Sequence, residues 1–218
     1  MRDWIRPAVL KPAVWAAAAT AFASYSRIVL WFDRPEQLAV LASLIFFLSF
    51  VLWGFVLAWH EKYSGRPVLV PQWEPALWLA VTACGAIGAV SMHHFIDPAL
   101  RPLLPENYPQ SLEKLAAMTL FTAAFAQLFL CFAPMAFFLR LFRSTPQSIL
   151  LTVLVGIFVV FMKLSPLRLP LSLLVCLLAV RGLSGYLAVF FYMRGGVLAA
   201  WWWVVLLEAR HLLALTAN

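Results

Sequence analysis

The chain of 218 residues is 64% hydrophobic and only 11% charged, and its formal net charge is +7. A soluble globular domain carries about 25% charged residues, and a soluble chain this apolar would expose large hydrophobic areas to water, so the composition excludes that class. The 16 Lys and Arg lie mostly in short segments between apolar runs. This pattern is typical of membrane topology and lipid head-group contact, not of nucleic-acid binding. The composition therefore predicts an integral protein of the lipid bilayer with no nucleic-acid partner.

The N-terminal half, residues 1–112, is expected to hold three transmembrane helices and a long proline-rich loop. Apolar runs of roughly 20 residues, the length that crosses a bilayer, cover residues 13–32, 37–59 and 74–96. The first run is long and follows a basic N-terminus, so we interpret it as a retained signal-anchor. Residues 97–111 are expected to form a loop, because prolines bar a helix there. These prolines are Pro98, Pro102, Pro105 and Pro109.

The C-terminal half, residues 113–218, begins with two further apolar runs. Residues 115–139 predict a helix with a kink near Leu130, because Pro134 removes a backbone donor and clashes with the preceding turn. Residues 147–162 predict a helix that is short for a full crossing. The protein has six transmembrane helices if this segment is re-entrant and seven if it crosses.

Two longer apolar runs complete the chain. Residues 170–192 and 197–215 predict helices separated by a break at Arg194-Gly195-Gly196. Each predicted helix is apolar around most of its circumference, as expected where one face meets lipid and another meets neighbouring helices. The predicted fold class is therefore all-α, a polytopic transmembrane helical bundle of six to seven helices.

Ionisable side chains inside the apolar runs are functional candidates, because charge in hydrocarbon is costly unless it is paired or hydrated. Arg181 and Glu208 lie at similar depth in the last two predicted helices. They are expected to form a buried charge pair, in which each charge offsets the desolvation of the other. Two interpretations stay open: a staple between the two helices, or part of a polar cavity that binds a ligand. Glu208 has no second carboxylate one, three or four residues away, which argues against a carboxylate dyad on this helix.

The sequence offers little to hold a metal or a cofactor. The cysteines are far apart and form no CxxC motif, which disfavours a cysteine-based zinc site; they are Cys84, Cys131 and Cys176. A bis-histidine haem needs two inward-facing histidines at matching depth on different helices. Only His211 lies well inside a predicted helix, and the other histidines are His60, His93 and His94. We therefore expect no metal and no cofactor, neither haem nor chlorophyll.

Three blocks in the C-terminal half carry a family resemblance. Residues 182–201, GLSGYLAVFFYMRGGVLAAW, look like a glycine-rich helix that ends in a short basic-glycine turn. Residues 125–131, FAQLFLC, look like a segment that bears an EExxxR motif, and Phe158-Val-Val-Phe-Met162 looks like an FxxxH motif. Over about residues 115–215 the chain thus resembles the CPBP family, the CAAX-prenyl-protease and bacteriocin-processing intramembrane proteases. The resemblance implies a CPBP-like helical core in the C-terminal half.

The chain departs from this family at the catalytic positions. In the family, paired glutamates and two helix histidines form the site, and a glutamate activates water. The positions in this chain are Ala126 and Gln127 for the glutamates, Cys131 for the motif arginine, Met162 for the first histidine and about Val205 for the second. An amide, a thioether and an alkyl group offer no base that could activate water. The resemblance therefore implies a relative that lacks the catalytic Glu and His.

The sequence leaves three functional hypotheses open. The one that the missing side chains favour is a non-catalytic binding or assembly protein, which holds a membrane protein, a lipid or a prenyl-like chain in the former active-site cavity. The second is an active intramembrane peptidase with a displaced site that uses Glu208 and His211. The third is an accessory subunit of a larger membrane complex. In each case we expect a location in a bacterial inner (plasma) membrane.

Overall fold

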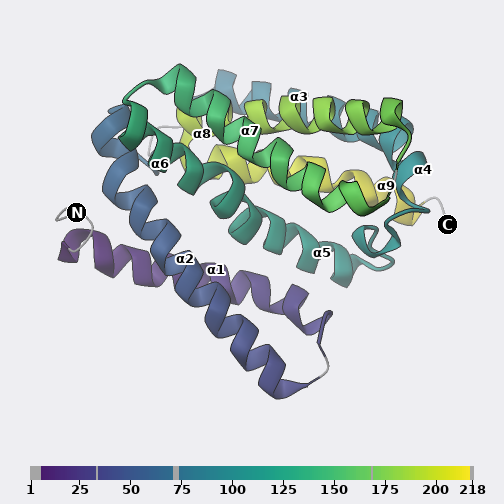
Figure 1. The fold of residues 1–218 in the computed structure, drawn as a ribbon, viewed down its shortest axis with the longest axis horizontal. Coiled ribbons are helices and arrows are strands. Elements are labelled where there is room, and N and C mark those ends of the chain that lie inside the picture. Colours follow the sequence, from purple (N-terminus) through teal and green to yellow (C-terminus); the bar gives the residue numbers. More distant parts are fainter. Residues whose placement is uncertain (1–5, 33, 71–73, 168, 217–218) are drawn as a thin grey trace.

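The computed structural model describes residues 6–32, 34–70, 74–167 and 169–216, and it has no strand among them. The α-helices in Figure 1 are α1 (Pro7–Val29), α2 (Pro35–Ser64), α3 (Pro75–Ser91), α4 (Asp97–Leu100), α5 (Leu112–Phe121), α6 (Ala133–Phe142), α7 (Thr145–Leu164), α8 (Leu171–Glu208) and α9 (Arg210–Thr216). Three π-helical segments, Met92–Ile96, Thr122–Ala126 and Leu128–Phe132, link some of these helices into longer rods. The predicted all-α class is confirmed.

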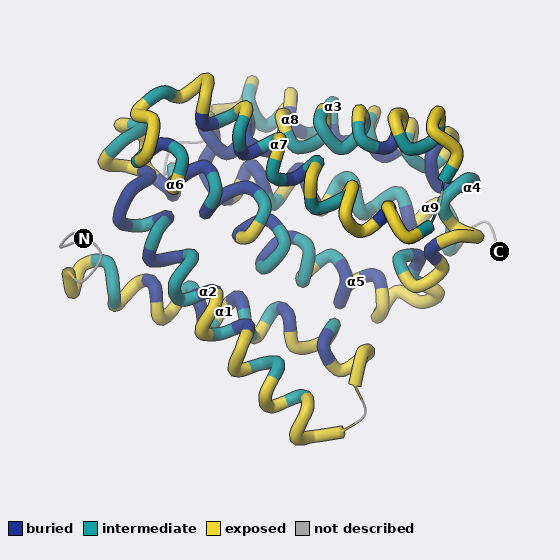
Figure 2. Tube along the Cα trace, viewed as in Figure 1, coloured by how far each residue is buried: buried dark blue, intermediate teal, exposed yellow. Residues whose placement is uncertain are grey.

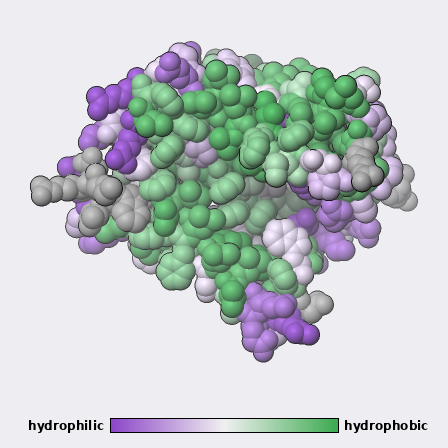
Figure 3. Space-filling model, in the orientation of Figure 1, coloured by the Kyte–Doolittle hydropathy of each residue, from purple (hydrophilic) through white to green (hydrophobic). Residues whose placement is uncertain are grey.

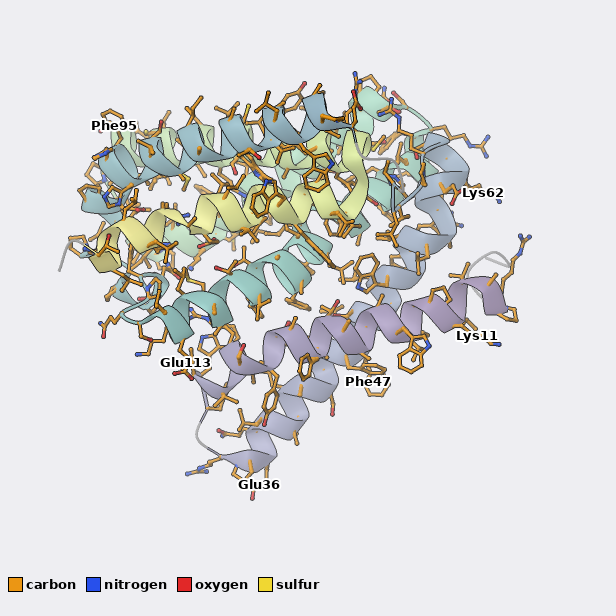
Figure 4. All side chains as sticks on the ribbon, turned by 180° about the vertical axis from the view of Figure 1, so that it is seen from behind. Lys11, Glu36, Phe47, Lys62, Phe95 and Glu113 are labelled. Carbon is orange, nitrogen blue, oxygen red and sulfur yellow. The ribbon has the colours of Figure 1, made fainter. Side chains whose placement is uncertain are left out.

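Apolar surface covers the outside of the bundle. Five stretches of the described chain are long and apolar enough to cross a membrane: Pro35–Ser64, Pro75–Leu100, Leu112–Phe142, Thr145–Leu167 and Leu171–Thr216. Figure 3 shows hydrophobic residues over most of one face, with hydrophilic residues gathered at its margins. In Figure 4, Phe47 and Phe95 point outward, whereas Glu36 and Lys62 lie near the two ends of α2. The chain is therefore an integral membrane protein.

Helix α8 is central to the packing of the C-terminal half. It packs against both α3 and α7, while α6 packs against α2 and α7. Helix α1 lies at the periphery, where it contacts α2 and α5 (Figure 1). Buried residues line the inner faces of these helices (Figure 2), and they form one large apolar cluster that includes Phe132 and Tyr192.

The predicted break at the glycine pair is present inside α8. Gly196 has φ 67° and ψ −164°, a conformation that no α-helix contains, so α8 consists of two helical arms that meet there. We name residues 171–195 the first arm and residues 197–208 the second arm. The amide of Val197 donates to the carbonyl of Val68 at 3.0 Å, and this bond fixes the turn against the end of α2. The two arms then run antiparallel, in lime and yellow in Figure 1.

The rod that contains Pro134 leaves the α-helical pattern where a kink was predicted. Leu128–Phe132 is π-helical and ends immediately before α6. Proline at position 134 cannot donate to the carbonyl of Leu130, and a π-helical turn accommodates such a lost bond by adding a residue. A second π-helical segment, Thr122–Ala126, precedes it, so the side chains between them are turned away from their α-helical directions.

Several helices extend beyond the predicted limits, each for a local reason. The segment predicted as 147–162 spans Thr145–Leu164, within a 23-residue candidate span, so it is not too short to cross. Helix α2 continues past residue 59 through a polar stretch to Ser64. It ends at Gly65, which has φ 68°. The loop predicted from residue 97 begins with α4, because the π-helical turn Met92–Ile96 admits Pro98 without breaking the rod.

Candidate functional site

An interior cavity of about 280 Å³ lies among the two π-helical segments of the α5–α6 rod, α7 and both arms of α8. Its wall is largely apolar, as in most small-molecule sites, with a few polar groups facing inward. These polar and charged residues are Thr122, Gln127, Thr152, Lys163, Arg181, Ser184, Glu208 and Arg210. A cavity with several charged groups inside a membrane bundle is a candidate functional site.

The π-helical segments direct two side chains of the α5–α6 rod into the cavity. Gln127 lies between the two segments and is only 9% exposed. Its Oε1 atom is enclosed and has no hydrogen-bond partner. Cys131, one turn later, is also buried and lines the same cavity. Buried amide groups are normally hydrogen-bonded, so an enclosed amide oxygen without a partner suggests that a ligand or water completes the site.

Arg181 enters the cavity from the first arm of α8. A Cβ atom on Gly156 of α7 would lie only 3.1 Å from its Nη2 atom, so the absence of a side chain at Gly156 makes room for the guanidinium. Its Nε atom is enclosed and has no hydrogen-bond partner. No carboxylate in the described residues forms an ion pair with it within 4 Å. A buried cation of this kind is normally paired.

The predicted charge pair between Arg181 and Glu208 is not formed, although both residues line the cavity. The Glu208 Oε2 atom lies 3.9 Å from Arg210 Nη1 and 3.5 Å from His211 Nε2. Arg181 is 15 residues before Gly196 (196 − 181), whereas Glu208 is 12 residues after it (208 − 196). At 1.5 Å per residue the two depths differ by about 4.5 Å, and the turn at Ala209 brings Arg210 and His211 closer to the carboxylate.

A second polar cluster adjoins the cavity at the end of α3. Arg210 Nε lies 3.4 Å from Asp97 Oδ1, and the Tyr108 hydroxyl donates to the same oxygen at 3.1 Å. His93 Nδ1 lies 4.0 Å from Asp97 Oδ2. Burial, and then the negative charge of Asp97, raise the pKa of Tyr108 above its usual value, so its hydroxyl stays protonated and donates. Sequence reasoning missed this cluster, because Asp97 and Tyr108 lie where an irregular loop was expected.

The two polar regions are continuous. A second cavity of about 440 Å³ is lined by Arg27, Asp97, Asn107 and Tyr108, and it shares Lys163, Glu208 and Arg210 with the first. Lys163 donates to Asn107 Oδ1 at 3.1 Å. A charged path thus connects the interior around Gln127 with the polar end of the bundle.

The family-motif positions divide between the cavity and the outer surface. Gln127 and Cys131 line the cavity, and Ala126 does not. Phe158 and Met162 are more than half exposed on the outside of α7, and Val205 is also exposed. Their helical neighbours Gly156, Val160 and Val204 line the cavity instead. The spacing of Thr152, Gly156 and Val160 at every fourth residue is the signal that would have identified the inward face of α7.

The histidines lie in three separate places. The His60 ring is buried against the Tyr192 ring, with centroids 4.6 Å apart. His93 and His94 contact each other, and His211 packs edge-on against Tyr108. Within the described ranges, no group of three or more His, Cys, Asp or Glu residues is arranged to hold a metal ion.

Comparison with protein-family models, curated proteins and solved structures finds no match to this chain. The fold and the site describe an all-α integral membrane protein with a charged cavity.

Proposed function

We propose that the chain is a non-catalytic CPBP-like protein of a bacterial inner membrane, which binds a membrane-borne ligand in its interior cavity. The observation that carries this proposal is Gln127, which lines a cavity of about 280 Å³ and whose buried Oε1 atom has no hydrogen-bond partner. Gln127 stands where the resemblance places a catalytic glutamate, Cys131 stands where it places the motif arginine, and both line the cavity. On this proposal the pocket is kept for binding, while the catalytic carboxylate is replaced by an amide.

The cavity wall lacks the acid–base groups that peptide hydrolysis needs around Gln127. An amide does not accept a proton from water near neutral pH, and Val160 and Val204 offer no polar atom. Among the described residues that line this cavity, Glu208 is the one carboxylate. Its Oε2 atom lies between Arg210 Nη1 and His211 Nε2, at 3.9 Å and 3.5 Å.

One observation favours a second candidate function, an active peptidase with a displaced site. His211 Nε2 and Glu208 Oε2 are 3.5 Å apart, so an imidazole and a carboxylate are neighbours here, although neither atom has a hydrogen-bond partner. However, His211 does not line either cavity and is almost fully buried behind Glu208. A substrate in the cavity would reach the carboxylate but not the imidazole.

The proposal predicts that the protein does not cleave a prenylated peptide. The purified full chain in liposomes is given a fluorogenic farnesylated peptide, and the release of the fluorophore is measured. We expect the same background rate for the wild type, Glu208→Gln and His211→Ala. General acid–base catalysis contributes roughly 100-fold or more. A wild-type rate higher by that factor, and lost in both variants, would establish the peptidase instead.

Filling the cavity is predicted to expel the bound molecule. Gly185 lines the cavity, and a Cβ atom added there would meet nothing within 4 Å, so Gly185→Leu adds hydrocarbon at a position where the chain has room for a side chain to begin. Native mass spectrometry of the protein in mild detergent measures the fraction of chains that retain a co-purified amphiphile. We expect this fraction to fall by roughly tenfold or more, which corresponds to a loss of about 1.4 kcal/mol of binding free energy. The matched control is Val175→Leu, an exposed position on the same arm. Equal retention in both variants would contradict the proposal.

A further inference from the structure

The cavity holds more positive than negative charge that lacks a partner. Arg210 is paired with Asp97 and Glu208. In contrast, neither Arg181 nor Lys163 forms an ion pair with a carboxylate of the described residues. Lys163 is exposed at the rim of the cavity, where it donates to the neutral amide of Asn107. Arg181 is the cation inside the cavity, and its enclosed Nε atom has no partner. A cation in a low-dielectric interior is costly unless an anion or water faces it, so this cavity is suited to an anionic group.

The donors around Arg181 suit the oxygens of such a group. A guanidinium binds carboxylate and phosphate through parallel N–H bonds, and such charge-assisted bonds are stronger than neutral ones. The amide of Gln127 faces the same cavity. The amide group also carries two N–H donors, which are the kind of group that binds an anionic oxygen.

An apolar groove adjoins this cavity. The groove has a volume of about 410 Å³ and lies between α3 and α8, which pack side by side (Figure 4). Serine hydroxyls are its main polar groups, and the rest of its wall is hydrocarbon or thiol. The groove and the cavity share Met92, Ile96, Val180, Ser184, Trp203 and Leu207. The groove and the cavity are therefore direct neighbours in the bundle.

We propose that the cavity and the groove form one site for an anionic single-chain lipid, with its carboxylate or phosphate against Arg181 and its hydrocarbon chain between α3 and α8. This inference rests on the proposed function, since it names the ligand class of the same cavity. The groove distinguishes a lipid from a small anion, because a free anion would leave the apolar groove unused. Lateral entry from the bilayer would bring the chain into the groove and the head group to the cation.

The test measures binding of defined probes to the delipidated full chain by native mass spectrometry and calorimetry. Oleate and oleyl phosphate carry the two head groups, oleyl alcohol is the neutral analogue, and inorganic phosphate is the anion without a chain. For the wild type we expect oleate or oleyl phosphate to bind roughly tenfold or more tightly than oleyl alcohol. Inorganic phosphate that binds as tightly as oleyl phosphate would overturn the lipid and indicate a site for a free anion.

Three variants and one control locate the head group and the chain; the control is Arg194→Met. Arg181→Met is expected to abolish the preference for the anionic probes, whereas Arg181→Lys retains part of it. Arg194→Met removes an exposed cation from the same arm and should change nothing. Cys176→Phe narrows the groove at an exposed position. It should weaken the binding of oleate without affecting the binding of inorganic phosphate. An unchanged preference in Arg181→Met would refute the assigned head-group contact.

The stability of the delipidated protein separates a binding role of Arg181 from a structural one. If Arg181 is a binding residue, it is an unpaired cation in the lipid-free chain. Its replacement by methionine then raises the melting temperature of that chain, and oleate no longer raises the melting temperature further. A structural role would lower the melting temperature. Suppose that Gly185→Leu expels a co-purified amphiphile while Arg181→Met keeps full oleate affinity. This result would support the proposed binding cavity and refute the proposed anionic ligand. If neither variant changes binding, both proposals fail.

Discussion

Gly196→Ala is expected to destabilise the folded protein by at least about 3 kcal/mol. The backbone at Gly196 has φ 67° and ψ −164°, a region that glycine alone occupies readily. A Cβ atom there would lie 2.6 Å from the carbonyl oxygen of Val68 and 3.1 Å from the amide nitrogen of Val70. Both contacts are with backbone atoms, so no side-chain rotation can relieve them. Relief of the clash would also break the bond from the Val197 amide to Val68.

The measurement is an SDS unfolding titration of the detergent-solubilised chain, followed by far-UV circular dichroism. Gly185→Ala is the matched control, because it adds the same methyl group to α8 at a helical position with free space. We expect the control to unfold at the wild-type SDS fraction or above it, since alanine favours the helix over glycine. Comparable losses in the two variants would mean that the turn at Gly196 is not the constraint that positions the two arms.

This turn is also the best example of what the sequence determines about the fold. Two glycines beside an arginine interrupt a long apolar run, and a helix that must reverse its direction in a membrane needs such a position. The helices themselves follow from runs of roughly 20 apolar residues. Their ends are less certain from sequence: polar residues after Trp59 look like a loop, yet α2 continues to Ser64, because backbone hydrogen bonds and not side-chain polarity define the end.

The sequence predicts the candidate site only in part. It does not give the relative depth of the polar side chains in the bundle or the direction in which each helix face points. Gln127, Arg181 and Glu208 are conspicuous as polar residues in apolar helices, and the structure places all three on one cavity. Their partners depend on where each helix starts relative to the others, which composition does not give. The inward face of α7 depends on the rotation of that helix, and hydrophobicity alone gives little signal for it because the helix is apolar on most sides; the small and polar residues Thr152 and Gly156 carry that signal instead. The motif alignment therefore selected Phe158 and Met162, which are exposed.

Arg210→Met is expected to destabilise the protein by about 3 kcal/mol, because removal of one partner from a buried ion pair leaves an uncompensated charge. Arg210 lies between Asp97 and Glu208, at 3.4 Å and 3.9 Å, and all three side chains are largely buried. Methionine retains much of the hydrocarbon volume, so the loss reports the charge. Arg210 Nη1 also donates to the carbonyl of Leu207 at 2.8 Å, which ties α9 to the end of α8.

A double-mutant cycle with Asp97→Asn tests whether the charges act on each other. In Asp97→Asn the Tyr108 hydroxyl still has an acceptor, and the negative charge is gone. The double variant is therefore expected to lose less stability than the sum of the two single variants, with a coupling of roughly 1 kcal/mol or more. Arg210→Lys should retain most of the wild-type stability, since it keeps the cation. Strict additivity, with Arg210→Lys as unstable as Arg210→Met, would instead assign the effect to the packing and hydrogen bonds of the guanidinium. In that case the carboxylates at this end of the cavity would not depend on Arg210 for compensation.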